Sequence, residues 1–157
     1  VEFKDDEITM IGTYAFCACL QLENVDLPNV TLLSDYVFSN CPALKSANLP
    51  NVPTIGTNAF YGCKLLTILD LPKATHLGGA AFGFCTALTR VILRSETLCS
   101  LSSTGTFYNT VFAEGGTGGT VYVPQALITE YQNATNWSTL YAAGTCNFVA
   151  IEGSEYE

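Results

Sequence analysis

One unit of sequence recurs every 22 residues over the first two thirds of this 157-residue chain. Like residues form columns in the aligned units, and the clearest columns are Phe16, Phe38, Phe60 and Phe82, then Cys19, Cys41, Cys63 and Cys85, then Leu22, Leu44, Leu66 and Leu88. Periods of about 20 to 50 residues are typical of solenoids, propellers and arrays, in which each unit packs on its neighbours. The period therefore predicts a stacked-repeat protein rather than an enzyme domain.

Each unit contains a short stretch in which apolar residues occupy every second position: Val25 and Leu27, Ala47 and Leu49, Leu69 and Leu71, Val91 and Leu93. This alternation predicts a strand with one buried face, so each coil should add one strand to a parallel sheet. Proline follows the first three stretches and should end those strands, because it lacks the N–H donor that a sheet needs.

The full unit reads Ile-Gly-x-x-Ala-Phe-x-x-Cys-x-x-Leu-x-x-Val/Leu-x-Leu-Pro, as in residues 55–72. It resembles the BspA-like leucine-rich repeats of bacterial surface proteins, in four copies over residues 8–94. Residues 121–124, Tyr131 and residues 136–138 are similar to the closing segment of that family. The resemblance implies a leucine-rich-repeat solenoid of the α/β horseshoe class, a right-handed coil of mostly parallel strands with turns and short helical segments. Arg94 departs from the pattern, since it stands where the earlier units have proline.

We expect one solenoid domain over residues 1–157. Residues 1–7, with Val1 and Phe3, should form an abbreviated N-terminal rung or cap, followed by the repeats of residues 8–94, a longer irregular repeat in 95–123, and a C-terminal cap and tail in 124–157. Thr104 stands where the next phenylalanine is expected, so the register of the irregular repeat is open. Its extra length falls in a stretch rich in Ser, Thr and Gly, which predicts a loop.

Beyond residue 124, Leu127, Ile128 and Tyr131 have the spacing of a short helix face, and Trp137 could cover the end of the stack, which would otherwise expose its core. Phe148 and Ile151 lie in an alternating run that could add a final strand. The acidic tail of residues 152–157 is either a linker into further domains or the end of the protein.

Four of the seven cysteines share one repeat column, which predicts the same buried setting in successive coils. Cys17, Cys99 and Cys146 lie outside the column, and the odd total leaves at least one free thiol in a monomer. Cys17 and Cys19 alone supply too few ligands for tetrahedral zinc. We therefore expect structural thiols, no metal and no cofactor.

The chain carries 14 acidic and 6 basic residues, and no cluster of Lys or Arg relieves the net charge of −8. Such a chain should repel phosphate backbones, which argues against nucleic acid as a partner. Its apolar runs are far shorter than the ~20 residues of a membrane helix, so no membrane insertion of this segment is expected.

Features that could suggest catalysis are weak. His76, the only histidine, stands in a variable column and is expected to face solvent, whereas a Cys–His pair would need a polarised thiol beside it. The glycines of residues 115–119 lack the Lys-Ser/Thr of a phosphate-binding loop. We expect no enzymatic activity.

Two columns should point outward from the predicted sheet: Asp26, Asn48, Asp70, Ile92 and Tyr122 in one, and Asn24, Ser46, Ile68 and Arg90 in the other. Solenoids often bind partners on their extended sheet, and apolar, aromatic and Arg side chains together are typical of binding anchors. The nine residues are therefore a candidate recognition surface; the alternative is a solvated face that binds nothing. Calcium does not fit, because Asp26 and Asp70 would lie ~10 Å apart at two strand spacings.

The resemblance implies an extracellular or cell-surface bacterial module with an adhesive role. The leading hypothesis is thus a non-catalytic module that recognises a host or bacterial protein or glycan through its sheet face. The second hypothesis is a rigid spacer or accessory domain of a larger surface protein.

Overall fold

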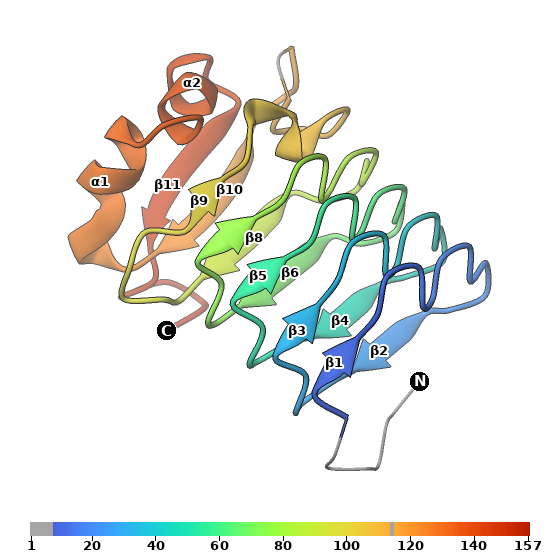
Figure 1. Ribbon diagram of the computed structural model, residues 1–157. Coiled ribbons are helices and arrows are strands. Elements are labelled where there is room, and N and C mark those ends of the chain that lie inside the picture. Colours follow the sequence, from blue (N-terminus) through green and yellow to red (C-terminus); the bar gives the residue numbers. More distant parts are fainter. Residues whose placement is uncertain (1–7, 114) are drawn as a thin grey trace.

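Two sets of parallel strands run along opposite sides of a coiled chain, and each turn of the coil adds one strand to each set (Figure 1). The computed structural model describes residues 8–113 and 115–157. The expected rung of Val1 and Phe3 lies outside the described residues.

Sheet II holds the strands that the alternation predicts, and its pairings are parallel. Sheet II consists of two hydrogen-bonded groups of strands, β2-β4 and β6-β8-β10-β11, which adjoin where β4 contacts β6. The strands are β2 (Asn24–Asp26), β4 (Ser46–Asn48), β6 (Ile68–Leu71), β8 (Arg90–Leu93), β10 (Gly119–Val123) and β11 (Cys146–Ala150). In β2-β4 and β6-β8, each residue pairs with the residue 22 positions along the chain.

Sheet I, on the other side, was not predicted. It has the order β1-β3-β5-β7-β9 and consists of β1 (Met10–Ile11), β3 (Leu32–Leu33), β5 (Thr54–Ile55), β7 (His76–Leu77) and β9 (Ser100–Leu101). Each strand has two residues, of which the second is buried and the first points out. Two residues are too few to show a period-2 pattern, so the sequence reveals only the buried column.

The third side of the coil consists of turns whose backbone hydrogen bonds also link successive coils. Phe38 donates its N–H to the Ala59 carbonyl at 2.7 Å, and Phe60 donates to Ala81 at 2.8 Å. The chain must approach its neighbour closely here: a Cβ added to Gly78 would lie 2.7 Å from the backbone of Gly56. A Cβ at Gly56 would likewise lie 2.6 Å from the backbone of Ser34, so close approach explains these two glycines, whereas Gly12 in the same column has open space around it.

Aromatic rings fill the interior in one continuous stack. Ring centroids are 5.5 Å apart for Phe16 and Phe38, 5.3 Å for Phe38 and Phe60, and 5.7 Å for Phe60 and Phe82. The stack continues to Phe107 at 5.5 Å from Phe82. The expectation of like residues lying over like residues therefore holds in the described coils.

Phe107 establishes the register of the fifth coil, which the sequence pattern left open. It lies 25 residues after Phe82 and ends the 3-10 helix η1 (Thr104–Phe107), while Thr104 begins that helix. β9 pairs with β7 at a spacing of 24 residues, and β10 pairs with β8 at 30. The extra residues are thus inserted at three places in the coil: before β9, between β9 and Phe107, and between Phe107 and β10. Because the first two insertions precede Phe107, this phenylalanine does not stand at the position that the 22-residue period predicts.

The column cysteines hydrogen-bond to the preceding coil. Cys41 Sγ donates to the Phe16 carbonyl at 3.0 Å, and Cys85 Sγ donates to the Phe60 carbonyl at 3.0 Å. All seven cysteines are free thiols, and Cys41, Cys63 and Cys85 are buried. Burial raises the pKa of Cys41 to about 12. The interpretation as structural thiols is consistent with this arrangement, although Cys19, the first of the column, is only partly buried. The hydrogen bonds add a reason for the regular spacing of these cysteines.

Buried thiols should make the protein sensitive to alkali. Burial raises the pKa of both Cys99 and Cys146 from 9.0 to about 12. Between about pH 9 and about pH 12 the unfolded chain loses thiol protons that the folded protein keeps, so the free energy of unfolding falls by about 1.4 kcal/mol per pH unit for each thiol. Below that window these groups contribute no pH dependence.

Cys146→Ala should reduce by one the number of protons released on unfolding, so the free energy of unfolding should fall less steeply with pH. Urea unfolding from pH 8 to pH 11 with reductant present would measure this slope. An unchanged slope would show that Cys146 is solvated in the folded protein.

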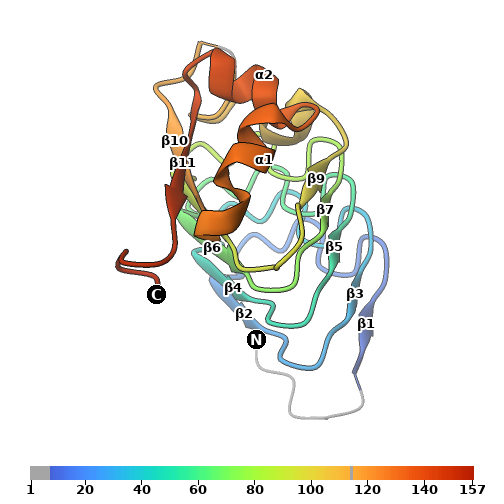
Figure 2. The ribbon, with the colours of Figure 1, turned by 90° about the vertical axis from the view of Figure 1, so that its left-hand side faces the viewer.

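The C-terminal end of the coil is covered by η2 (Gln125–Leu127), α1 (Ile128–Asn133) and α2 (Trp137–Ala142), which lie across it in Figure 2. Tyr131 and Trp137 are fully buried there. The Tyr131 hydroxyl accepts the Cys99 N–H at 2.9 Å, and Trp137 Nε1 donates to the Cys99 carbonyl at 2.6 Å. The cap therefore satisfies backbone groups beside β9, the last strand of sheet I, that another coil would otherwise pair. Within the described ranges, no helix has the length and apolar character to cross a membrane.

Candidate functional site

The nine predicted recognition residues lie in two adjacent rows on sheet II. The strand register places Asp26 beside Asn48, and Asp70, Ile92 and Tyr122 beside one another. In the second row Asn24 lies beside Ser46, and Ile68 beside Arg90. Because side chains alternate along a strand, both rows belong to the face opposite the core residues Val25, Leu69 and Val91.

The N-terminal half of this face is open to solvent. Asn24, Ser46 and Asn48 are exposed, and Ile68 is 36% exposed. Hydrogen bonds between neighbouring strands hold the polar side chains: Ser46 Oγ donates to Asn24 Oδ1 at 2.7 Å, and Asn48 Nδ2 donates to Asp26 Oδ1 at 2.7 Å. We call this half, made of Asn24, Asp26, Ser46, Asn48 and Ile68, the open face.

The C-terminal half is partly covered, and here one expectation is wrong. Ile92 should be exposed, but it is only 1% exposed although it lies outside the core cluster. Residues 151–157, which follow β11, turn to the outer side of sheet II beside it (Figure 2). Tyr156 brings its ring to 4.6 Å from that of Tyr122, at an interplanar angle of 67°.

Two arginines tie this tail to the sheet. Arg90 Nη1 donates to the Tyr156 hydroxyl at 3.2 Å and lies 3.8 Å from Glu155 Oε1. Arg94 donates through Nε and Nη2 to the Asp70 carboxylate at 2.9 to 3.0 Å, and its Nη1 donates to the Tyr156 carbonyl at 2.7 Å. The planar guanidinium of Arg94 thus binds Asp70 through its Nε–Nη2 edge and the tail through Nη1. We call Arg90, Ile92, Arg94 and Tyr122 the arginine cluster.

Sequence reasoning missed Arg94 and Tyr156 as members of this surface. Arg94 carried a signal, because it replaces proline at the end of its repeat, but the pattern did not indicate its partner. Tyr156 carried none, because a tail outside the repeats has no column to place it. Arg90 and Arg94 are the only arginines of the chain, and both contact the tail.

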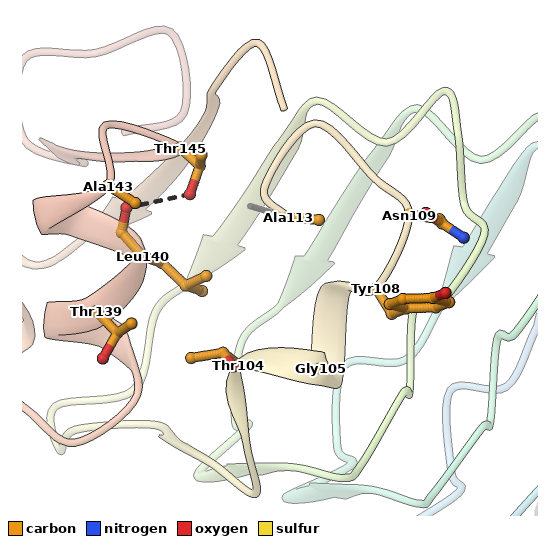
Figure 3. Close-up of a pocket in the computed structure, with 9 residues that line it drawn as sticks. All are labelled: Thr104, Gly105, Tyr108, Asn109, Ala113, Thr139, Leu140, Ala143 and Thr145. Atoms are coloured by element: carbon orange, nitrogen blue, oxygen red, sulfur yellow. Dashed lines mark hydrogen bonds between the residues drawn. The ribbon is translucent and has the colours of Figure 1, made fainter. Parts of the chain in front are cut away.

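A separate cleft of about 500 Å³ lies between the fifth coil and α2 (Figure 3). Its described lining residues are uncharged, and apolar groups make up most of the surface, with Tyr108, which is 54% exposed, and Asn109 on one side and Thr139 and Thr145 on the other. Such a lining can hydrogen-bond an uncharged polar molecule. Among the described residues that line it, none carries a carboxylate, imidazole, amine or thiol that could act in a reaction.

His76 lies on the outer row of sheet I, with Nδ1 2.8 Å from the Ser100 hydroxyl and Nε2 2.9 Å from the Ser102 hydroxyl. Both ring nitrogens are therefore engaged by hydroxyl groups instead of a thiol. A hydrogen-bonding contact with Cys85 and burial raise the pKa of Cys63, which keeps that thiol protonated and poorly nucleophilic. Within residues 8–113 and 115–157, no three His, Cys, Asp or Glu side chains form a group that could hold a metal ion.

Comparisons with known proteins agree with this architecture. The family described as the BspA type leucine rich repeat region matches residues 3–114 in six copies, two more than the four counted from the sequence. A solved leucine-rich repeat protein from Bacteroides ovatus ATCC 8483 is similar at a TM-score of 0.62 and 19% identity. That alignment covers 96% of this chain and 42% of the solved one, so this chain spans less than half of its neighbour's length. No curated protein matches the chain.

Proposed function

We propose that this chain, which belongs to the BspA-type leucine-rich-repeat family, is a non-catalytic module that binds a protein partner on the outer face of sheet II. Leucine-rich-repeat proteins are in general interaction or structural modules, and BspA-type repeats are typical of bacterial surface proteins. We further propose an extracellular or cell-surface location for this chain.

The observation that carries the proposal is the side-chain order of the open face. The Ser46–Asn24 and Asn48–Asp26 hydrogen bonds hold polar groups in fixed positions around the exposed Ile68. Ordered side chains lose little conformational entropy when a partner binds, and an exposed apolar group between polar ones can serve as an anchor. The raised thiol pKa values and the hydroxyl partners of His76 support the absence of catalysis.

Ile68→Glu should weaken partner binding by about tenfold or more, because it places an unpaired carboxylate at the centre of the contact. A panel of host extracellular and bacterial surface proteins would be screened by biolayer interferometry for a saturable partner, and the variant would then be titrated. Leu32→Glu is the matched control, since Leu32 is 47% exposed on the outer row of sheet I.

Equal losses in both variants would place the contact away from sheet II. No saturable partner in the panel would favour the second candidate, a rigid spacer or accessory domain, in which the stack holds other parts of a larger protein apart.

A further inference from the structure

The segment after β11 is anchored at its start and folds back over the arginine cluster. Ile151 donates its N–H to the Val123 carbonyl at 2.9 Å, and Glu152 accepts the Gln125 N–H at 2.9 Å. The chain then reverses through Gly153, which adopts a φ of +79° that favours glycine. The reversal directs residues 154–157 to the outer side of sheet II (Figure 2).

The sheet contacts four different parts of the Glu155–Tyr156 dipeptide in this segment. Arg90 engages the Glu155 carboxylate and the Tyr156 hydroxyl. Arg94 engages the Tyr156 backbone carbonyl, and Tyr122 packs edge-on against the Tyr156 ring. Carboxylate, ring, hydroxyl and main chain are all recognised, as in a complex between a protein and a short peptide.

Charge is arranged to suit an acidic ligand. The chain has a net charge of −8, yet both of its arginines lie here: Arg90 begins β8, and Arg94 directly follows the strand. Asp70 accepts hydrogen bonds from Nε and Nη2 on one edge of the Arg94 guanidinium, which fixes the orientation of Nη1. The cluster is therefore an ordered cationic and aromatic surface within an acidic protein.

We propose that the arginine cluster is a recognition site for a peptide segment in which an acidic residue precedes tyrosine, and that residues 152–157 occupy this site as a tethered competitor. The proposal rests on the proposed function and names the partner chemistry for one half of the same face. A partner protein would present an acidic residue followed by tyrosine on an exposed turn or strand, and it would displace the tail.

The exposure of the tail and its ion pair allows a partner to displace it. Glu152, Gly153, Glu155 and Glu157 are exposed, and the side chains of Arg90 and Glu155 are 44% and 62% exposed at a separation of 3.8 Å. Exposed ion pairs contribute little to stability, so release of the tail should not unfold the coil. The tether nevertheless keeps the local concentration of the tail high, which a free ligand must overcome.

The test uses the 157-residue chain with the tail disabled by Glu155→Ser and Tyr156→Gly, and a fluorescein-labelled synthetic peptide Ile-Glu-Gly-Ser-Glu-Tyr-Glu. Fluorescence polarisation should show saturable binding to this opened variant, about tenfold or more tighter than binding to the unmodified chain. Adding Arg90→Ala to the opened variant, or replacing the peptide tyrosine with alanine, should abolish binding. Higher salt should weaken it, because charge contributes to recognition.

Tyr141→Ala is the matched control, since it removes a tyrosine that is 41% exposed on α2, away from the tail; it should bind the peptide no better than the unmodified chain. No binding by an opened variant that keeps the far-ultraviolet circular dichroism of the parent would overturn the proposal. So would equal binding by the opened and unmodified chains. Either result would leave the Ile68→Glu test of the open face standing, so the two proposals can fail separately.

Discussion

Phe60→Ala should lower the free energy of unfolding by about 3 to 5 kcal/mol, because it removes a fully buried ring and leaves a cavity in the middle of the stack. Phe60 lies between Phe38 and Phe82, and its carbonyl accepts the Cys85 thiol at 3.0 Å. In a repeat protein each coil contacts only its neighbours, so a defect at Phe60 weakens two coil–coil interfaces at once.

Urea unfolding followed by circular dichroism would measure this loss, with Leu65→Ala as the control from the same coil. Leu65 is 50% exposed, so its truncation should change stability by less than about 1 kcal/mol. Phe16→Ala should lie between the two, because Phe16 is only partly buried at the edge of the described stack. Equal stability of Phe60→Ala and the unmodified protein would contradict a core built from stacked rings.

Trp137→Ala should be comparably severe, with a loss of about 3 to 5 kcal/mol. The indole is fully buried, its ring lies 5.9 Å from Phe107 and 5.7 Å from Tyr131, and Nε1 donates to the Cys99 carbonyl. Its removal exposes the end of the ring stack and leaves a backbone carbonyl beside the last strand of sheet I without its donor. Terminal repeats of solenoids need such a cover.

Two variants separate the contributions of packing and hydrogen bonding. Trp137→Phe retains most of the ring and loses the N–H, so it should cost about 1 to 3 kcal/mol. Tyr141→Ala, on the same helix but 41% exposed, should have a small effect. Thermal unfolding monitored at two wavelengths would compare all three, and a tolerated Trp137→Ala would show that the coil does not depend on its cap.

Repetition accounts for the features that sequence reasoning predicted well. A column of identical residues reports which face of the coil a side chain occupies, so Phe60 and Leu69 could be placed in the interior and Asn48 on the outer face of a strand, although burial is only partial for Phe16 in the first described coil. Features without repetition were harder to place. Sheet I was missed because two residues carry no period, and Phe107 was missed because insertions moved it three positions beyond the column.

At the candidate site, the position of Ile92 could be predicted from the sequence but its burial could not. Its position in the outer row followed from strand alternation, and the register agrees with that position. Its burial did not follow from the repeat pattern, and the tail that contacts its neighbours Arg90 and Tyr122 belongs to no repeat. The nine-residue surface expected from the sequence is therefore divided in the structure, with an open face at one end and a partly covered arginine cluster at the other.

For this protein, the sequence by itself determined the coil, its ring-filled core and the set of side chains that leave sheet II, because those features depend on local pattern and on contacts between identical neighbours. The tertiary structure alone decided which of those side chains a partner can reach. Accessibility depends on where the unique C-terminal segment returns, and that return is set by single contacts of Arg90 and Arg94 that no periodicity encodes.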